Sequence, residues 1–401
     1  MQSSSNNTVT LQPPAARALQ LLLRAGYGAY AVGGCVRDSL MGRPCSDWDL
    51  TTSASPADVL RVFAGFHTIE TGIRHGTVTV IVDGMPLEIT TFRTESTYTD
   101  GRHPDSVRFA ARIEDDLSRR DFTVNAIAFS PESGLADPFH GLKDLEKRLI
   151  RCVGDPVTRF SEDGLRILRA VRFSAVLGFT VEKNTSDALY ACADMLTHVS
   201  AERKAAELAK LLKGPYASDV LRVHAPLLRH IVPVSDDAAA RIDRLPASLP
   251  LRMSALLWDE TPEAAQSALE TLRYDKKTIR TVRTLLEAAH APLPESLGNL
   301  RRCVGRCGPL WEDVLTLAAA DGKDVEALRQ ETAAIRARGD CVSLDTLAVN
   351  GQKLLRIGMK DREIGETLSY LLGAVMDGSL PNEEKPLLEE AAKHLKRKME
   401  S

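Results

Sequence analysis

The stretch that decides the fold is Tyr30-Ala-Val-Gly-Gly-Cys-Val-Arg37-Asp38, followed after a short loop by Ser46-Asp-Trp-Asp-Leu-Thr51. The apolar run 30–32 predicts a short strand that ends at Gly33-Gly34, where the backbone can approach a ligand closely. Residues 36–40 predict the start of a helix, whose unpaired N–H groups would face the same ligand. Arg37 adds a guanidinium that can bind phosphate oxygens in two places. The stretch therefore predicts an anion site.

Two carboxylates, Asp47 and Asp49, follow this stretch and alternate with Trp48 and Leu50. In an extended strand both carboxylates leave one face, and the apolar pair points to a core. Two adjacent oxygen ligands suit Mg²⁺, which usually takes one or two carboxylates together with substrate phosphates. Asp-x-Asp alone is also typical of a solvated strand end or turn. The anion site a few residues upstream favours a metal site.

A second strand pair is predicted from the β-branched run 77–82, the turn Asp83-Gly84 and the run 87–92. In its second arm Glu88 is a single acidic group in an otherwise apolar strand. Glu88 is either a third carboxylate beside Asp47 and Asp49 or a surface glutamate.

Composition places broad limits on the protein. With 401 residues the chain should form more than one core, and the net charge of −3 disfavours a chain that binds nucleic acid by overall charge. We expect no membrane span, because no apolar run approaches ~18 residues. Residues 1–14 are polar and uncharged and are expected to be a disordered lead-in, neither signal nor transit peptide. Seven scattered cysteines without a CxxC pair predict a reduced, cytoplasmic protein.

The predicted fold class is α+β in the first third and all-helical afterwards. No strand is predicted after Asp155. Helices are expected over residues 117–129 and 160–173, among others, and a mobile charged loop over 94–108. The expected divisions are a lead-in (1–14), an α+β unit (15–150) and helical units at 151–214, 215–340 and 341–401.

A second candidate site lies in Glu162-Asp-Gly-Leu-Arg166-Ile-Leu-Arg169-Ala-Val-Arg172-Phe173. On one continuous helix Asp163, Arg166 and Arg169 would be neighbours, and Arg172 would reach them with its long side chain. A salt-bridged amphipathic helix explains the same pattern. A carboxylate that only accepts, beside a guanidinium that only donates, also complements the edges of cytosine and adenine and mismatches uracil and guanine.

Taken together, these motifs resemble the class II CCA-adding enzymes, the tRNA nucleotidyltransferases of the polymerase-β-like nucleotidyltransferase superfamily. The resemblance extends over most of the chain. It is carried by Gly-Gly-Cys-Val-Arg-Asp, Asp47-x-Asp49, Leu-Glu-Ile-Thr-Thr-Phe-Arg (87–93), Arg-Arg-Asp-Phe-Thr-Val-Asn-Ala (119–126) and Glu-Asp-Gly-Leu-Arg (162–166). Residues 71–80 resemble the family's head domain, and 345–382 resemble the tail of its bacterial forms.

The resemblance implies a nucleotidyltransferase head with a mixed or antiparallel sheet, a helical neck that recognises the base, a helical body and a tRNA-binding tail. It implies Mg²⁺-dependent addition of CCA to tRNA 3′ ends from CTP and ATP, without a membrane, and leaves the oligomeric state open. Asp47 and Asp49 would hold the metals, with Glu88 as the third catalytic carboxylate. The implied nucleotide-binding residues are Gly34, Arg37, Arg120, Asp163, Arg166, Arg169 and Arg172. The basic C-terminal residues Lys393, Lys396, Arg397 and Lys398 are a candidate contact for the RNA backbone.

Three rival functions within the same class are a bacterial poly(A) polymerase, a CC-adding enzyme and an A-adding enzyme. A poly(A) polymerase is expected to carry a strongly basic C-terminal extension, and the chain has only a short cluster. A CC-adding enzyme is expected to lack the charged loop, of which residues 98–108 are intact. A non-catalytic RNA-binding module is expected to lose Asp47 or Asp49, and both are present. Full CCA addition is therefore favoured, and A-only addition stays open.

Overall fold

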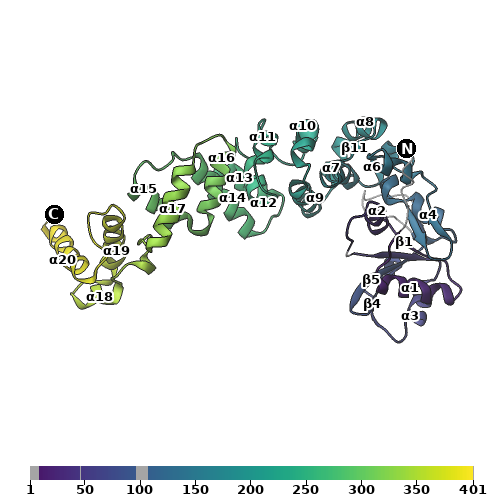
Figure 1. Cartoon of the computed structure of the whole chain (residues 1–401), viewed down its shortest axis with the longest axis horizontal. Helices are drawn as coiled ribbons and strands as arrows, with labels where there is room; N and C mark the ends of the chain where they lie inside the picture. The colour runs from purple at the N-terminus through teal and green to yellow at the C-terminus, as the bar shows by residue number, and fades with distance from the viewer. Residues whose placement is uncertain (1–8, 46, 96–106, 401) are drawn as a thin grey trace. The chain divides into compact units, whose positions relative to one another are not determined.

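The computed structural model describes residues 9–45, 47–95 and 107–400. By its contacts the chain divides into residues 1–232 and 233–401, which are described separately below. The predicted fold class is confirmed, because a mixed sheet is followed by helices (Figure 1).

The main sheet of the first unit has, among the described residues, the strand order β3-β4-β5-β2-β1-β8-β9. The strands are β1 (Ala29–Val32), β2 (Asp49–Thr52), β3 (His67–Ile69), β4 (Thr77–Val82), β5 (Met85–Thr91), β8 (Ala128–Ser130) and β9 (Gly134–Ala136). β2 and β5 run parallel, and the other neighbours run antiparallel. The predicted hairpin is therefore confirmed as β4–β5.

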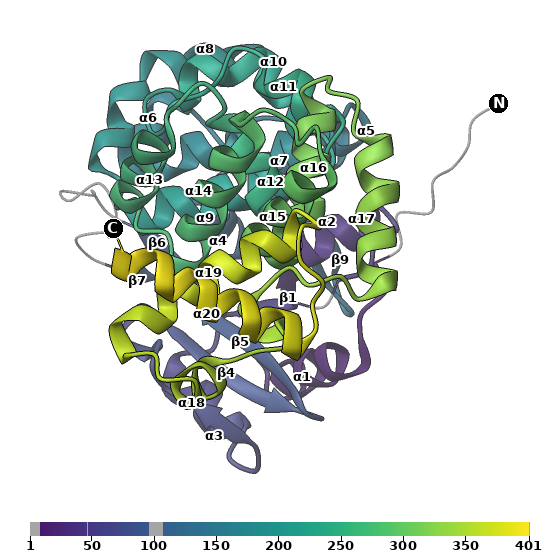
Figure 2. The ribbon, with the colours of Figure 1, turned by 90° about the vertical axis from the view of Figure 1, so that its left-hand side faces the viewer.

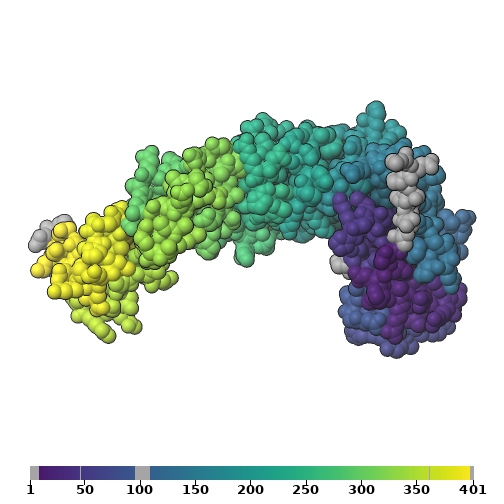
Figure 3. Space-filling view, viewed as in Figure 1, coloured from purple at the N-terminus to yellow at the C-terminus, as the bar shows by residue number. Residues whose placement is uncertain are grey.

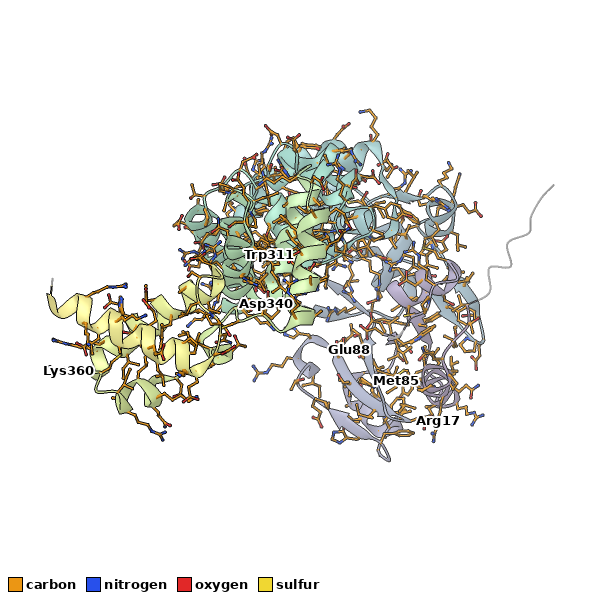
Figure 4. All side chains as sticks on the ribbon, turned by 60° about the vertical axis from the view of Figure 1, so that its left-hand side comes forward. Arg17, Met85, Glu88, Trp311, Asp340 and Lys360 are labelled. Atoms are coloured by element: carbon orange, nitrogen blue, oxygen red, sulfur yellow. The ribbon has the colours of Figure 1, made fainter. Side chains whose placement is uncertain are left out.

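One face of this sheet packs on helices, and the other is covered at β1 and β8 but carries the exposed Glu88 on β5. Along β5, Leu87 and Ile89 are fully buried, whereas Glu88 between them is exposed. The buried side chains join the core with α1 (Pro13–Arg24) and α3 (Pro56–Val62), which lie beside β4 and β5 in Figure 1. Burying each such side chain contributes roughly 1.5–3 kcal/mol. This alternation places Glu88 on the exposed side of β5. Figure 4 labels Glu88 on this strand.

The remaining elements of the first unit are mostly short. The helices are α2 (Gly34–Leu40), α4 (Ile113–Ser118), α5 (Gly141–Glu146), α6 (Pro156–Glu162), α7 (Leu165–Leu177), α8 (Lys183–Ala191), α9 (Ala201–Lys213) and α10 (Ala217–Leu228). β6 (Arg93–Glu95) pairs with β7 (Val107–Phe109), and β10 (Leu149–Ile150) pairs in parallel with β11 (Thr180–Val181). The strand β11 corrects the expectation of no strand after Asp155. Most of the predicted loop 94–108 lies outside the described residues.

Two predicted helices are wrong. The helix expected over 117–129 ends at Ser118, and the chain continues through a 3₁₀ turn (Thr123–Asn125) into β8. The backbone N–H of Phe122 donates to the Asp121 carboxylate instead of a helical carbonyl. The helix expected over 160–173 is interrupted at Asp163-Gly164, because Asp163 is extended and a side chain at position 164 would meet the Met195 carbonyl oxygen at 2.5 Å.

The expected lead-in, 1–14, is too long. Val9 is buried in the core of the first unit, and the backbone N–H of Thr10 donates to Ser39 Oγ at 2.9 Å. Residues 1–8 lie outside the described part of the chain. At the other end of the unit, α10 packs on α7, so the contacts divide the chain after Val232 and not at the expected position 214/215.

The second unit is helical throughout its described residues. Its helices are α11 (Ala238–Asp243), α12 (Leu249–Leu256), α13 (Pro262–Thr271), α14 (Lys276–His290), α15 (Leu297–Cys307), α16 (Trp311–Ala320), α17 (Glu326–Arg338), α18 (Gly351–Arg356), α19 (Asp361–Met376) and α20 (Glu384–Glu400). α19 and α20 lie side by side in Figure 2 and close a separate small core around Leu371 and Leu387. Figure 3 shows the surface of these last helices in yellow.

Candidate active site

The glycine stretch lies at the turn from β1 into α2. Gly33 has φ +82°, a conformation that L side chains rarely adopt, and α2 begins at Gly34. A Cβ at Gly33 would lie 3.0 Å from Arg120 Nη1, and one at Gly34 would lie 3.5 Å from Arg37 Nη2. Two guanidiniums therefore lie against this turn, as an anion site requires.

The acidic residues gather at the start of β2. Asp47 and Asp49 are exposed and Trp48 and Leu50 are buried, which confirms the predicted alternation. Asp49 pairs in register with Glu88 of the parallel neighbour β5. Loss of solvent around the Asp49 carboxylate raises its pKa to about 6; Arg120 opposes this shift, and Asp47 and Glu88 add to it. Three carboxylates and one guanidinium thus share this edge of the sheet.

These oxygen ligands suit a divalent cation whose remaining coordination positions are filled by other ligands. Within the described residues no three His, Cys, Asp or Glu side chains already form a closed metal cluster. Mg²⁺ does not need one, since it takes few carboxylates and fills its other positions with water and phosphate oxygens. Asp47 and Asp49 could supply the carboxylate oxygens for such an ion.

Arg37 and Arg120 are held by different partners. The buried Arg37 donates from Nη1 to Asn125 Oδ1 at 2.6 Å and also pairs with Asp38. Arg120 pairs through Nη2 with the buried carboxylate of Asp116 at 3.4 Å. Burial lowers the pKa of Arg120, and Asp116 opposes that effect.

The residues of the second candidate site do not lie on one continuous helix surface. Asp163 lies before α7 and accepts two bonds from Arg203 of α9, at 2.8 and 3.2 Å. Arg166 pairs instead with Glu162 and donates to the carbonyl oxygens of Arg159 and Arg119, each at 3.1 Å. The direct Asp163–Arg166 pairing is therefore not observed.

The other two arginines of α7 pair with acidic residues of other segments. Arg169 pairs with Asp121 at 2.7 Å, and Arg172 pairs with Glu207 at 2.8 Å. The ring of Phe173 lies under the guanidiniums of Arg37, Arg169 and Arg172, with centroid distances of 5.2, 5.3 and 3.6 Å. Arg37 of the glycine stretch thus contacts the same ring as two neck residues.

The acidic residues at the start of β2 and the candidate base site around Arg166 are connected through two consecutive residues, Arg119 and Arg120. Arg166 donates to the backbone of Arg119, and the next residue, Arg120, lies close enough to Asp49 to lower its pKa. The two candidate sites are therefore connected through adjacent residues of one segment.

Several residues of the site were missed by the sequence reasoning, namely Asp116, Asp121, Asn125, Phe173, Arg203 and Glu207. Asp121 and Asn125 belong to the motif 119–126, which was noticed, but only Arg120 was assigned from it. Glu207 and Arg203 on α9 carried no local signal, because their partners are far away in the sequence.

Comparison with known proteins agrees with this geometry. A family model described as the poly A polymerase head domain matches residues 29–151. Models described as the probable RNA and SrmB-binding site of polymerase A and as tRNA nucleotidyltransferase domain 2 match 178–238 and 253–391. A CCA-adding enzyme from Geobacillus thermodenitrificans is 37% identical over 392 residues, which cover 94% of this chain and 96% of that protein.

The chain belongs to the family of CCA-adding enzymes. The crystal structure of the Bacillus stearothermophilus CCA-adding enzyme in complex with CTP is similar over 97% of this chain and all of that one, with a TM-score of 0.82 and 33% identity. The fold is also that of the Thermotoga maritima CCA-adding enzyme complexed with tRNA, with a TM-score of 0.69, 21% identity and 96% of each chain covered. These full-length likenesses decide between the predicted functions in favour of a tRNA nucleotidyltransferase.

No described helix of this family member is both long and apolar enough to cross a membrane.

Proposed function

We propose that this CCA-adding enzyme completes tRNA 3′ ends with C, C and A, using CTP and ATP at the head. The observation that carries the assignment is the pairing of Asp49 with Glu88 beside Arg120, next to the turn at Gly33-Gly34. Negative side chains on one side and guanidiniums on the other match the two charged parts of the reaction, a metal-bound reaction centre and a triphosphate.

Asp47 and Asp49 would hold Mg²⁺, with Glu88 as a third carboxylate. When bound, the metal supplies activation of the primer hydroxyl and neutralisation of the departing pyrophosphate. The chain's own contribution is positioning: Arg37 and Arg120 bind the triphosphate, and Gly34 leaves room for it. Without a covalent intermediate, catalysis depends on alignment and charge.

Asp163 and Arg166 would select the base by presenting an acceptor beside a donor. Cytosine and adenine match that pattern, and a mismatched buried group costs about 1–3 kcal/mol. In the nucleotide-free chain Asp163 is held by Arg203 and Arg166 by Glu162, so both side chains are pre-positioned by other residues. Arg169 and Arg172 line the same pocket.

The helical second unit would bind the tRNA by backbone charge and shape. Lys393 and Arg397 of α20 are 62% and 67% exposed and share one partner, Glu390, at 3.6 Å each. A shared carboxylate leaves net positive charge on this helix for phosphates. The seven cysteines are free thiols, which supports a reducing compartment, the cytoplasm.

Nucleotide incorporation tests the assignment. Purified enzyme is given tRNA that lacks CCA, CA or A, with CTP alone, ATP alone or both. Asp49→Ala should abolish every addition and keep tRNA binding, whereas Arg166→Ala should keep addition and reduce the preference for CTP and ATP over UTP and GTP. Products that stop at A, at CC or as long A tracts would each establish a rival function. Retained addition by Asp49→Ala would refute the proposed centre.

A further inference from the structure

Asp116 of α4, a buried acidic residue to which no role has been assigned above, is a strong candidate for a further role. Its side chain is fully buried, and burying a carboxylate is costly unless several groups bond to it. Its Oδ1 accepts from Arg119 Nε at 3.0 Å and Nη2 at 2.8 Å, and from the backbone N–H of Arg93 at 3.4 Å. Its Oδ2 lies 3.4 Å from Arg120 Nη2 and 3.5 Å from Thr51 Oγ1.

These partners come from the segments that surround the candidate reaction centre. Thr51 is two residues beyond Asp49 on β2, and Arg119 provides the carbonyl oxygen that accepts from Arg166. Asp116 therefore lies on the face of β2 that carries Asp49, beside the segment whose backbone accepts from Arg166.

Arg120 is the neighbour of Asp116 through which Asp116 could affect the reaction. Its guanidinium lies against Gly33 and pairs with Asp116, and it is near enough to Asp49 to lower the pKa of that carboxylate. Its buried Nε has no hydrogen-bond partner within the described residues. A buried donor without an acceptor is costly, so this side chain is arranged for an acceptor that arrives with the substrate.

The position of Arg120 depends on which carboxylate attracts it. A fixed charge at Asp116 keeps the guanidinium at the glycine turn. Without that charge, Asp49 and Asp121 are the carboxylates that remain near Arg120. Because Asp121 is already bonded to Arg169, Asn125 and its own backbone neighbour, Asp49 is the more available partner, and a pair between Arg120 and Asp49 would occupy both groups that the reaction needs.

We propose that Asp116 is a positioning residue that holds Arg120 at the Gly33-Gly34 turn, where it binds the incoming triphosphate, and prevents Arg120 from pairing with Asp49. This inference rests on the proposed function for the role of Arg120. Because Arg120 would contact the part that all nucleotides share, the effect of Asp116 should not depend on the base.

The test is Asp116→Asn, which keeps the shape and removes the charge. CTP affinity is measured by calorimetry, and KM and kcat are measured for CTP and ATP. We expect KM to rise by about tenfold for both nucleotides, because that is the effect of losing one charge-assisted hydrogen bond. The preference for CTP and ATP over UTP should stay unchanged. The matched control is Asp115→Asn, the adjacent half-buried carboxylate of α4, which should stay within about twofold of the unsubstituted enzyme.

A double-substitution cycle separates positioning from a general structural role. If Asp116 acts through Arg120, Asp116→Asn should weaken CTP binding no further in an Arg120→Ala background. An equal loss in both backgrounds, or a lower melting temperature with unchanged CTP affinity, would overturn the inference. If Asp116→Asn fails to fold, Asp116→Glu, which keeps the charge but displaces it, should raise KM by a smaller factor, and an unchanged KM would overturn it. An unsubstituted enzyme that binds CTP but does not extend tRNA would instead refute the proposed function.

Discussion

Replacing Asp49 with Asn should stabilise the metal-free enzyme at neutral pH. The Asp49 carboxylate has lost part of its contact with solvent, although the residue keeps an exposed surface, and it lies beside two other acidic groups, Asp47 and Glu88. The folded chain therefore disfavours its charge. Asn has a similar shape and carries no charge at any pH. The substitution therefore relieves repulsion that the enzyme tolerates for its function.

The magnitude follows from the pKa of Asp49, which is about 6 in the folded chain against an ordinary value of 3.8. At about 1.4 kcal/mol per pKa unit, this difference sets an upper limit of about 3 kcal/mol. Because Asp49 is exposed, solvent screening reduces the expected effect to about 1 kcal/mol. The folded-state pKa is raised, so the stability contributed by the protonated form is fully present below pH 3.8 and is lost as the pH rises through about 6.

The assay is urea unfolding in the presence of a chelator, followed by hydrogen exchange of peptides from β1, β2 and β5, because the chain has more than one unit. At pH 7.5 Asp49→Asn should have a larger free energy of unfolding than the unsubstituted enzyme. Near pH 4 the free energies of unfolding of the two proteins should coincide. Asp115→Asn serves as the matched control and should show no such crossover. A difference that does not change with pH, or a less stable Asn variant at pH 7.5, would refute the electrostatic explanation.

Three further substitutions test the packing of the second unit and the candidate base site. Gly305→Ala on α15 should lower the free energy of unfolding by about 1–2 kcal/mol, because its methyl group would overlap the Val342 carbonyl oxygen and overpacking outweighs a helix-propensity gain of about 1 kcal/mol. Gly365→Ala on α19, with nothing within 4 Å, should raise it by up to about 1 kcal/mol, and urea denaturation measures both. Arg203→Ala should reduce the ratio of kcat/KM for CTP over UTP by roughly tenfold, since Asp163 loses its two bonds to Arg203; an unchanged ratio would contradict this role.

The sequence predicted best where a local repeat decides the structure. Alternation of polar and apolar residues placed Asp49 and Glu88 on the outward face of their strands, and the register of β2 with β5 brings them together. The turn at Gly33 was equally predictable, because its φ of +82° is a conformation that favours glycine. In each case a local pattern decides how the residue itself is oriented.

The predictions failed where distant side chains override helix periodicity. A continuous helix over 160–173 satisfied the apolar spacing, but Gly164 packs against the backbone of Met195, and that contact separates Asp163 from α7. Asp163 consequently pairs with Arg203 and not with Arg166. A helix pattern contains no information about either distant partner.

The motif 119–126 shows why such local failures matter for function. Because this segment leaves the helix, Asp121 and Asn125 turn inward and bond to each other at 3.1 Å. Asn125 then accepts from Arg37, and Asp121 accepts from Arg169. Under the proposed function, this chain of bonds joins a residue that binds the triphosphate to a helix that lines the base pocket. A helical segment would have pointed these side chains to different sides and left Arg37 and Arg169 without these partners. The irregular backbone thus brings Arg37 and Arg169 into one hydrogen-bonded chain, which under the proposed function would fix the distance between phosphate and base recognition.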